Sequence, residues 1–540
     1  MTNIAAALLR VALETPDRVA LVDRTGAGGR STTFAELLAA VTSHAEFLRD
    51  QGIGPGDRVM LMVRPSREFI ALTFALFALG CVVILIDPGM GYKNLLCCIG
   101  SVRPGVLVAI PRAQLFSRLF PKPFRTVRRR VTVGSALGLL GPELPPPDSG
   151  SQGLIIAPTE ADDLAAIIFT TGSTGPPKGV RYEHRIFAAQ LTQIRNYYHI
   201  GPGEIDQPAF PLFALFSIAL GATAVIPEMD PTRPARVDPR KFIRTLNHYQ
   251  VTYSFGSPAI WQVISRYCHD QGLTLASLRK VLMAGAPVSG ELIERLTAIL
   301  PPGAEIHIPY GATEALPIVS ITGREVLAET WALTRQGRGA CVGRPLPGIE
   351  VRVIAIAEGL LAPADPALQP LPVNAVGEII VRGPVVTAAY DHNDRENQVA
   401  KIGEGEGFWH RMGDLGYLDE IGRLWFCGRK AHRVITQQGT LYTICCEAVF
   451  NNHPQVARSA LVGVGEPGRM RPVLIVEPSA KVKDPRQLFR ELRQLAVRHD
   501  HTAGIELFLL HDSFPVDIRH NAKIFREKLA LWAAGRVGRK

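Results

Sequence analysis

Short runs of β-branched and other apolar residues recur along the first third of the chain, and stretches with helical spacing separate them. The runs are RVMLMV at residues 58–63, CVVILI at 81–86, GVLVAI at 105–110 and AAIIFT at 165–170. Buried parallel strands carry continuous apolar runs, and strands that alternate with helices pair in parallel sheets. The pattern therefore predicts an α/β fold in which helices cover parallel sheets.

A long apolar stretch at residues 69–86 has two interpretations. Its length is about the minimum for a transmembrane helix. It also divides at Gly80 into FIALTFALFAL, which is typical of a helix, and CVVILI, which is typical of a strand. A buried helix followed by a buried parallel strand explains the pattern without a membrane, and we expect no transmembrane span.

Two loose segments interrupt the alternation of strands and helices. We predict a connector at residues 141–153, GPELPPPDSGSQG. We predict a surface insertion at residues 359–374, which are rich in Ala, Pro and Leu. A chain of 540 residues, 47% of them apolar, is too long for one core, and the pattern restarts as a small αβ unit near Gly428. We predict a large N-terminal domain over residues 1–427 and a small C-terminal domain over residues 428–540.

Charge and cysteine content limit the ligands and the cellular compartment that fit this chain. The net charge of +10 favours an anionic ligand such as ATP, or an acidic membrane surface. The dense basic run at residues 125–130 has no aromatic interleaving, so a solvated face explains it better than a nucleic-acid site, and no nucleic-acid partner is expected. Eight cysteines without a CxxC pair, and a first segment unlike a signal peptide, favour the cytoplasm.

The segment AIIFTTGSTGPPKGV, residues 166–180, is the part of the sequence that indicates a chemical function most specifically. A buried strand ends at Phe169, and glycines, hydroxyl side chains and Lys178 follow it. Glycines let consecutive backbone N–H groups face an anion, hydroxyls add donors, and the lysine adds charge. The GxxxxGK[ST] pattern is absent, so this is a phosphate loop of another kind and not the P-loop. A plain linker is the alternative, but linkers seldom follow a buried strand.

At this loop the chain resembles the adenylate-forming superfamily of acyl-CoA synthetases, luciferases and adenylation domains. Further motifs follow in the family's order: AGAP at 284–287, PYGATEA at 309–315, GEIIVRGPVVTAAY at 377–390, WHRMGDLGYLDE at 409–420 and CGRK at 427–430. The resemblance spans essentially the whole chain. It implies a large N-terminal domain of layered αβ subdomains and a small mobile α+β domain, with the nucleotide in the cleft between them.

The resemblance also implies roles for individual residues. Tyr310 would stack on adenine, Thr313 would touch the α-phosphate, and Asp414 would accept hydrogen bonds from the ribose hydroxyls. The full set of implied nucleotide-binding residues is Thr170, Thr171, Gly172, Ser173, Thr174, Gly175, Lys178, Gly285, Ala286, Pro287, Tyr310, Gly311, Thr313, Asp414 and Arg429. The implied cofactors are ATP and Mg²⁺, with Glu314 as the metal ligand.

The implied chemistry is attack of a carboxylate on the α-phosphorus of ATP. Positive charge must neutralise both anions and the leaving pyrophosphate. Thr171, Glu314 and Lys523 are the implied catalytic residues. Lys523 in NAKIFREKL fits the family's GKIxR pattern better than its neighbours Lys528 and Arg519 do, although Asn521 and Ala522 replace the usual Ser–Gly.

The chain differs from the superfamily's sequence pattern in the segments that would serve thioester formation. Ala431 occupies the hinge position that usually holds Asp or Lys. In residues 433–447, the loop that would reach the site for thioester formation, Thr440, Thr443 and Cys445 replace the usual Arg, Pro and Glu, and Gln438 falls on the loop glycine. Ala214 also replaces a histidine often found after PLF. These departures weaken the expectation of coenzyme A transfer.

Longer segments of the sequence resemble a narrower family, the β-lactone synthetases of bacterial long-chain olefin biosynthesis. The segments are LMVRPSREFIALTFALFALG, LIDPGMGYKNLL, FCGRKAHRV and PVDIRHNAKIFREKLA. The resemblance implies a long-chain 2-alkyl-3-hydroxy acid whose own hydroxyl attacks the adenylate, which needs no coenzyme A. It also implies, as partners, other enzymes of an olefin or β-lactone pathway. The apolar segment 209–221 could line an alkyl pocket or belong to the core.

Two other functions remain open from the sequence. One is a long-chain fatty acyl-CoA ligase with unusual loops, and the other is a catalytically dead adenylate-binding scaffold. The presence of Thr171, Glu314, Asp414 and Lys523 argues against the scaffold. The base for the 3-hydroxyl is not identified, because His184, His307 and His410 are candidates only through their titration near neutrality and core or surface packing explains each better.

Overall fold

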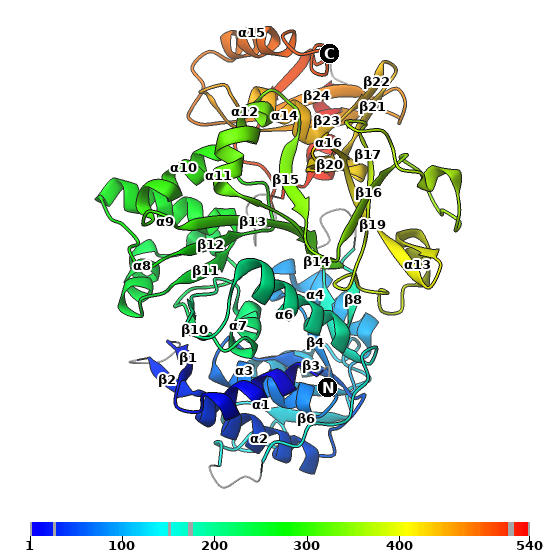
Figure 1. Ribbon diagram of the computed structural model, residues 1–540. Helices are drawn as coiled ribbons and strands as arrows, with labels where there is room; N and C mark the ends of the chain where they lie inside the picture. The colour runs from blue at the N-terminus through cyan, green and yellow to red at the C-terminus, as the bar shows by residue number, and fades with distance from the viewer. Residues whose placement is uncertain (1–2, 25–28, 149–152, 171–175, 517–522, 538–540) are drawn as a thin grey trace.

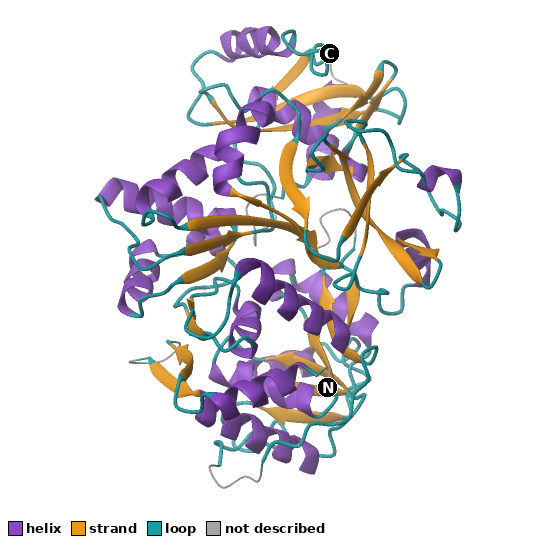
Figure 2. Ribbon diagram, in the orientation of Figure 1, coloured by secondary structure: helices purple, strands orange, loops and turns teal. Residues whose placement is uncertain are grey.

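A computed structural model describes residues 3–24, 29–148, 153–170, 176–516 and 523–537. The chain builds three regions that follow one another in sequence (Figure 1). The blue and cyan N-terminal region lies at one end of the molecule, the green region lies in the middle, and the orange and red C-terminal region lies at the other end. Helices lie outside the sheets in each region (Figure 2).

The N-terminal region contains a six-stranded sheet whose first five strands are parallel and whose last strand, β8, is antiparallel. In spatial order the strands are β6 (Arg129–Thr132), β5 (Val106–Ala109), β3 (Arg58–Met62), β4 (Val82–Leu85), β7 (Leu164–Phe169) and β8 (Gly179–Glu183). The four apolar runs form β3, β4, β5 and β7, so the predicted parallel sheet is confirmed.

Helices cover both faces of this sheet. On one face α1 (Ile4–Glu14), α2 (Phe34–Asp50) and α3 (Arg67–Ala78) contribute to a large apolar core, and on the other face lie α4 (Tyr92–Val102) and α5 (Pro111–Leu119). Of the twelve residues of α3, only Glu68 is not buried, which explains its unbroken apolar run. The stretch at 69–86 is thus a buried helix and a buried parallel strand. Within the described ranges, no helix has both the length and the apolar character needed to cross a bilayer.

A fourteen-stranded sheet forms the middle of the molecule. Its strands in spatial order are β16 (Glu350–Ile354), β17 (Gly377–Arg382), β19 (Gly407–Leu418), β20 (Leu424–Arg429), β15 (Ala340–Pro345), β14 (Ala315–Thr322), β13 (Glu305–Ala312), β12 (Lys280–Met283), β11 (Tyr253–Gly256), β9 (Ile205–Asp206), β10 (Thr223–Ile226), β1 (Val19–Asp23) and β2 (Arg30–Thr33), and β18 (Lys401–Glu404) pairs with β19. The stretch from β13 to β20 is antiparallel, and it carries most of the predicted motifs.

Helices also accompany this large sheet. They are α6 (His184–Tyr198), α7 (Ala214–Ala219), α8 (Pro239–His248), α9 (Pro258–Gln271), α10 (Gly290–Ile299), α11 (Gly323–Glu325), α12 (Trp331–Arg335) and α13 (Asp394–Ala400). Apolar side chains of α8, α9 and α10 form one core with β12 and β13. Every side chain of α7 is buried, and most of them belong to the large core that also includes α1 and α3.

The C-terminal region is a three-stranded sheet between helices. The strands are β23 (Val456–Val464), β24 (Arg471–Pro478) and β25 (Leu507–Leu510), with α14 (Thr443–Phe450) and α15 (Pro485–Ala496) on one face and α16 (Arg526–Val537) on the other. Alternate side chains of β23 and β24 enter the two cores, as the period of a strand requires. A hairpin of β21 (Val434–Thr436) and β22 (Gly439–Leu441) precedes them. The α/β fold with a small C-terminal α+β unit is as predicted, and the division after residue 427 stays a prediction.

Asp206 in β9 is a buried acid within the middle region. Its carboxylate accepts a hydrogen bond of 2.6 Å from the hydroxyl of Ser217 in α7. Burial raises the pKa of Asp206 to about 8, although the Ser217 hydrogen bond favours the charged form. The folded protein therefore holds a proton on this side chain at pH values where the unfolded chain, with an ordinary pKa of 3.8, releases it.

We predict that Asp206→Asn removes a pH dependence of stability. Between about pH 4 and pH 8 the folded state binds more protons at Asp206 than the unfolded state does, so wild-type stability falls as pH rises. Asparagine mimics the protonated acid and does not titrate. From pH 5 to pH 8, the free energy of unfolding of the variant should therefore rise relative to that of the wild type, by at most about 5 kcal/mol. Melting temperatures measured across this range, with the exposed Asp512→Asn as control, test the prediction. Parallel curves for wild type and Asp206→Asn would contradict it.

Candidate active site

The predicted phosphate loop joins β7 and β8. At the base of the loop, the N–H of Thr170 donates to the carbonyl of Lys178 (3.0 Å), and the N–H of Lys178 donates to Oγ1 of Thr170 (3.1 Å). These bonds fix both ends of the loop at the end of a buried strand. The residues between them that the sequence predicts to bind phosphate, Thr171, Gly172, Ser173, Thr174 and Gly175, lie outside the described residues.

Lys178 lies among groups from the region after β17. Its ammonium group forms an ion pair with Glu396 in α13, and it lies 5.1 Å from the centre of the Tyr390 ring. A carboxylate and an aromatic face both attract a cation. A phosphate that binds Lys178 must therefore replace or share the interaction with Glu396.

Asp414, Tyr310 and Arg429 form one hydrogen-bonded group from three strands. The hydroxyl of Tyr310 in β13 donates to Oδ2 of Asp414 in β19 (2.6 Å), and Nη1 of Arg429 in β20 donates to Oδ1 (2.8 Å). Asp414 and Arg429 are paired positions of adjacent strands. Burial and the Asp414 charge raise the pKa of Tyr310 well above its usual value, so the phenol remains a donor. Asp414 already accepts two bonds, and a carboxylate accepts about four, so it retains capacity for ribose hydroxyls.

Glu314 lies in the turn between β13 and β14, and two residues near β17 hold it. The hydroxyl of Tyr390 donates to Oε1 of Glu314 (2.8 Å), and the N–H and hydroxyl of Thr387 donate to its backbone carbonyl (2.9 and 3.0 Å). The hydroxyl of Tyr182 in β8 donates to the carbonyl of Thr313 (2.6 Å), which connects this turn to the strand that follows the phosphate loop. A fixed carboxylate is a ligand type that Mg²⁺ prefers, usually together with substrate phosphates.

Backbone geometry favours glycine at two positions of the motifs. Gly285, after β12, has a φ of 96°, a conformation that side chains rarely adopt. A Cβ on Gly311 in β13 would lie 2.5 Å from the carbonyl oxygen of Ala315, so only glycine fits there. Because β12 and β13 are parallel, Gly285, Ala286 and Pro287 follow one strand at the edge of the sheet where β13 presents Tyr310 and Gly311.

The site also contains a lysine that no motif of the sequence predicts. Lys401 in β18 donates to the carbonyl of Thr387 and lies 5.3 Å from the centre of the Phe408 ring. Burial lowers its pKa to about 7, and the charges of Glu314 and Glu183 act in the opposite direction. No recognised motif includes Lys401, which begins the hairpin of β18 and β19.

The three histidines considered as bases are buried side chains. Nδ1 of His410 lies 3.2 Å from the carbonyl of Ala400, His307 pairs with Glu305 (3.0 Å), and His184 packs edge-on against Phe77. Burial lowers the pKa of His184 and of His410, so both favour the neutral form. These contacts agree with packing roles, which the sequence had favoured over catalysis.

The two neighbours of Ala431 in the chain, Lys430 and His432, bind different parts of the molecule. Before it, the ammonium group of Lys430 donates to Glu378 in β17 (3.0 Å). After it, His432 pairs with Glu527 in α16 (3.0 Å). One neighbour is thus bound to the large sheet and the other to the C-terminal helix. Arg433 also pairs with Glu358, which follows β16, so both parts of the molecule hold the segment after Ala431, and the hinge stays a prediction.

Lys523 lies in the C-terminal region, directly before the buried Ile524 and α16. Ile524 forms a bridge with Val516, and Arg526 donates three hydrogen bonds, of 3.2, 2.8 and 2.6 Å, to the carboxylate of Glu447 in α14. The one residue of the thiolation motif that matches the family therefore has a structural partner. Of the alternatives to Lys523, Arg519 lies outside the described residues, and Lys528 lies over the Phe525 ring (4.8 Å).

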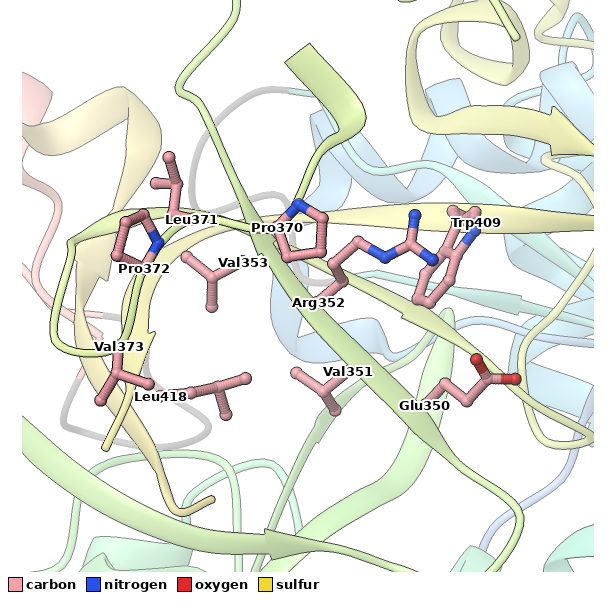
Figure 3. Close-up of a pocket in the computed structure, with 10 residues that line it drawn as sticks. All are labelled: Glu350, Val351, Arg352, Val353, Pro370, Leu371, Pro372, Val373, Trp409 and Leu418. Carbon is pink, nitrogen blue, oxygen red and sulfur yellow. The ribbon is translucent and has the colours of Figure 1, made fainter. Parts of the chain in front are cut away.

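A separate pocket of about 300 Å³ opens beside β16 (Figure 3). Residues 370–373 of the predicted insertion form one wall, and Arg352 lies over the Trp409 ring at 4.3 Å. The pocket carries one carboxylate, Glu350, which is paired with Arg382. Among the predicted nucleotide-binding residues that the structure describes, none lines this pocket.

The family of AMP-binding enzymes matches residues 8–391, and the chain belongs to this family. Within it, the chain is 46% identical to the olefin beta-lactone synthetase of Xanthomonas campestris pv. campestris, over 99% of this chain and 98% of that protein. It is 44% identical to the olefin beta-lactone synthetase of Stenotrophomonas maltophilia, over 100% and 99% of the two chains. Among solved structures, the amide bond synthetase McbA from Marinactinospora thermotolerans is similar, with a TM-score of 0.80, 26% identity, and coverage of 98% and 99%.

Proposed function

We propose that the protein joins a long-chain 2-alkyl-3-hydroxy fatty acid to AMP and then closes the acyl-adenylate to a β-lactone. The observation that carries this proposal is 46% and 44% identity, over nearly the whole chain, to two olefin beta-lactone synthetases. The recognised superfamily motifs and the geometry around Asp414 and Glu314 support the adenylation half.

In the first step a carboxylate oxygen of the acid attacks the α-phosphorus of ATP, and pyrophosphate leaves. Lys178 and the loop after β7 would hold the phosphates. Asp414 would accept the ribose hydroxyls while Tyr310 and Arg429 keep its carboxylate in place. Glu314, oriented by Tyr390, would bind Mg²⁺, which supplies positive charge at the phosphates. Lys523 would add charge at the transition state.

In the second step the 3-hydroxyl oxygen attacks the acyl carbonyl carbon, the bond to AMP breaks, and the hydroxyl loses its proton. The nucleophile is part of the substrate, so the protein needs only to orient it and exclude water. The thiolation segment fits this scheme, because Thr443, Cys445 and Glu447 are buried in α14 and Glu447 is bound to Arg526. Phe213 stacks on Phe255 at 4.0 Å beside α7, and this apolar region is our candidate for alkyl contacts.

The test compares a 2-alkyl-3-hydroxy acid with its 3-deoxy analogue, each with ATP and Mg²⁺, with and without coenzyme A. We expect the hydroxy acid to give AMP and a β-lactone, identified by NMR, at a rate that coenzyme A does not change. The 3-deoxy acid should stop at bound acyl-adenylate, because it lacks the nucleophile. Coenzyme A-dependent turnover of the 3-deoxy acid to a thioester would overturn the lactone proposal and favour a fatty acyl-CoA ligase.

We also propose that the enzyme works in the cytoplasm with other enzymes of an olefin or β-lactone pathway. All eight cysteines are free thiols, as a reducing compartment favours.

A further inference from the structure

The positive charge of the chain is concentrated in one segment. Between Asp87 and Glu143 there is no Asp or Glu. The same segment carries nine cations: Lys93, Arg103, Arg112, Arg118, Lys122, Arg125, Arg128, Arg129 and Arg130. The net charge of the whole chain is +10, so this segment accounts for nearly all of it. The basic run at 125–130, which by itself reads as a solvated face, is part of this larger feature.

Helix α5 in this segment turns two polar side chains toward the sheet, beside Ala113 and Phe116, which are partly buried against the core. Gln114 and Ser117 are buried, and Nε2 of Gln114 donates to the carbonyl of Val131 in β6 (2.9 Å). Leu115 and Leu119 instead face solvent, and Leu119 is 75% exposed. A surface helix normally buries its apolar residues. The two exposed leucines therefore contribute little to the core of the fold.

Neighbouring elements extend this face into one patch. The Tyr92 ring of α4 is 74% exposed and lies 5.9 Å from Phe116 of α5, which in turn lies 4.9 Å from Phe120. Nη2 of Arg118 donates to the carbonyl of Leu139 (3.2 Å), which brings the loop with Leu137 and Leu139 beside α5. We define the apolar patch by its exposed members: Tyr92, Leu115, Leu119, Phe120, Leu137 and Leu139.

Exposed cations lie close in sequence to members of the apolar patch, in a segment that contains no carboxylate. Lys93 follows Tyr92, Arg112 and Arg118 belong to α5, and Lys122, Arg125 and Arg128 follow it. Arg129 differs because it pairs with Asp57 (3.1 Å). We call the six exposed side chains Lys93, Arg112, Arg118, Lys122, Arg125 and Arg128 the basic rim.

We propose that the apolar patch and the basic rim dock the enzyme on a lipid membrane that carries anionic head groups. Leucine, phenylalanine and tyrosine side chains insert at the boundary between head groups and acyl chains, and Lys and Arg beside them attract anionic lipids. Nucleic acid fits less well, because a phosphate backbone calls for donors where this surface presents apolar groups at its centre. The inference rests on the surface itself and not on the proposed reaction.

No residue of the apolar patch or of the basic rim is among the residues predicted to bind the nucleotide. The patch covers α4, α5 and the loop near Leu137, on the face of the six-stranded sheet that packs against α4 and α5. The nucleotide residues lie after β7 and on β13, β19 and β20. Substitutions in the patch can therefore weaken membrane binding without removing a residue of the adenylation site.

The experiment measures sedimentation of the full-length protein with vesicles of phosphatidylcholine, with or without phosphatidylglycerol. The charge variant is Lys122→Gln, Arg125→Gln, Arg128→Gln, and its matched control is Lys481→Gln, Lys483→Gln, Arg486→Gln on the C-terminal region. The apolar variant is Leu119→Ser with Leu139→Ser, and its control is Leu360→Ser with Val497→Ser, both exposed positions elsewhere. Adenylation, measured as ATP–pyrophosphate exchange, reports whether each variant is folded.

We expect the wild type to bind vesicles that contain phosphatidylglycerol and to be released by salt. Neutralising a rim cation should weaken binding about five-fold, so the charge variant should lose about a hundred-fold. The apolar variant should lose at least about ten-fold, and neither control should change. The proposal fails if the wild type stays in solution with anionic vesicles at low salt, or if the controls lose as much binding as the patch variants. It also fails if a short DNA or RNA duplex binds this surface and anionic vesicles do not.

Discussion

Lys523→Ala is expected to slow adenylate formation by at least about a hundred-fold, because one positioned charge at a developing transition state contributes about 3–4 kcal/mol. The affinity for ATP should change little, since the substitution removes neither Asp414 nor the hydrogen bonds that Tyr310 and Arg429 donate to it. Lys523 is separated from them in the chain and precedes α16 of the C-terminal region. Pyrophosphate release in single turnover, together with equilibrium ATP binding, separates the two effects.

The matched control for this prediction is Lys528→Ala, a second lysine in the same segment, within α16 and over the Phe525 ring. It removes the same side chain and a similar amount of positive charge from the C-terminal region. A specific role for Lys523 requires near wild-type rates in Lys528→Ala. If Lys523→Ala releases pyrophosphate at the wild-type rate, or if both variants are equally slow, Lys523 is not the catalytic lysine.

Asp414→Asn is expected to weaken the binding of both ATP and AMP by about a hundred-fold. Asparagine removes the charge that Arg429 faces and places an N–H₂ group against donors from Arg429 or Tyr310. Loss of hydrogen bonds to a charged group costs about 1.5–3 kcal/mol each. The Asp414 charge raises the pKa of Arg429, so the guanidinium remains charged and loses its counter-charge in the variant.

Tyr310→Phe provides the graded comparison for Asp414→Asn. It removes one donor to Asp414 and leaves the ion pair with Arg429 in place, so nucleotide affinity should fall by about ten-fold. Calorimetric titration with AMP measures both variants, and melting temperatures without nucleotide report any loss of folding. Nucleotide affinity that is unchanged in Asp414→Asn would exclude a ribose-binding role for this carboxylate.

Several features could be predicted from the sequence because they depend on local order along the chain. The runs at 58–63, 81–86, 105–110 and 165–170 became parallel strands, since an unbroken apolar run can only be buried on both faces. The helix and strand at 69–86 were separable because Gly80, with a φ of 68°, ends the helix. The motifs at Tyr310, Glu314 and Asp414 were recognisable as short strings, and the family match extends over residues 8–391.

Other features depend on how distant segments meet. The ammonium group of Lys401 in β18 donates to the carbonyl of Thr387, in the segment after β17, and no spacing in the sequence predicts this contact. The same holds for Lys178, whose partner Glu396 comes from α13. These contacts form only when the strands and helices pack, because the sequence does not show which partner each ammonium group meets.

The sequence by itself determined the class of fold, the order of the motifs and the residue types available for adenylation, because apolar runs, glycine turns and short motifs act over a few neighbouring residues. Only the tertiary structure decided which of these residues touch. The register of β19 against β20 places Arg429 opposite Asp414, and the packing of α5 turns Gln114 inward and Leu119 outward. In a helix as short as α5, periodicity identifies two faces but not which one meets the sheet, and that choice created the exposed patch.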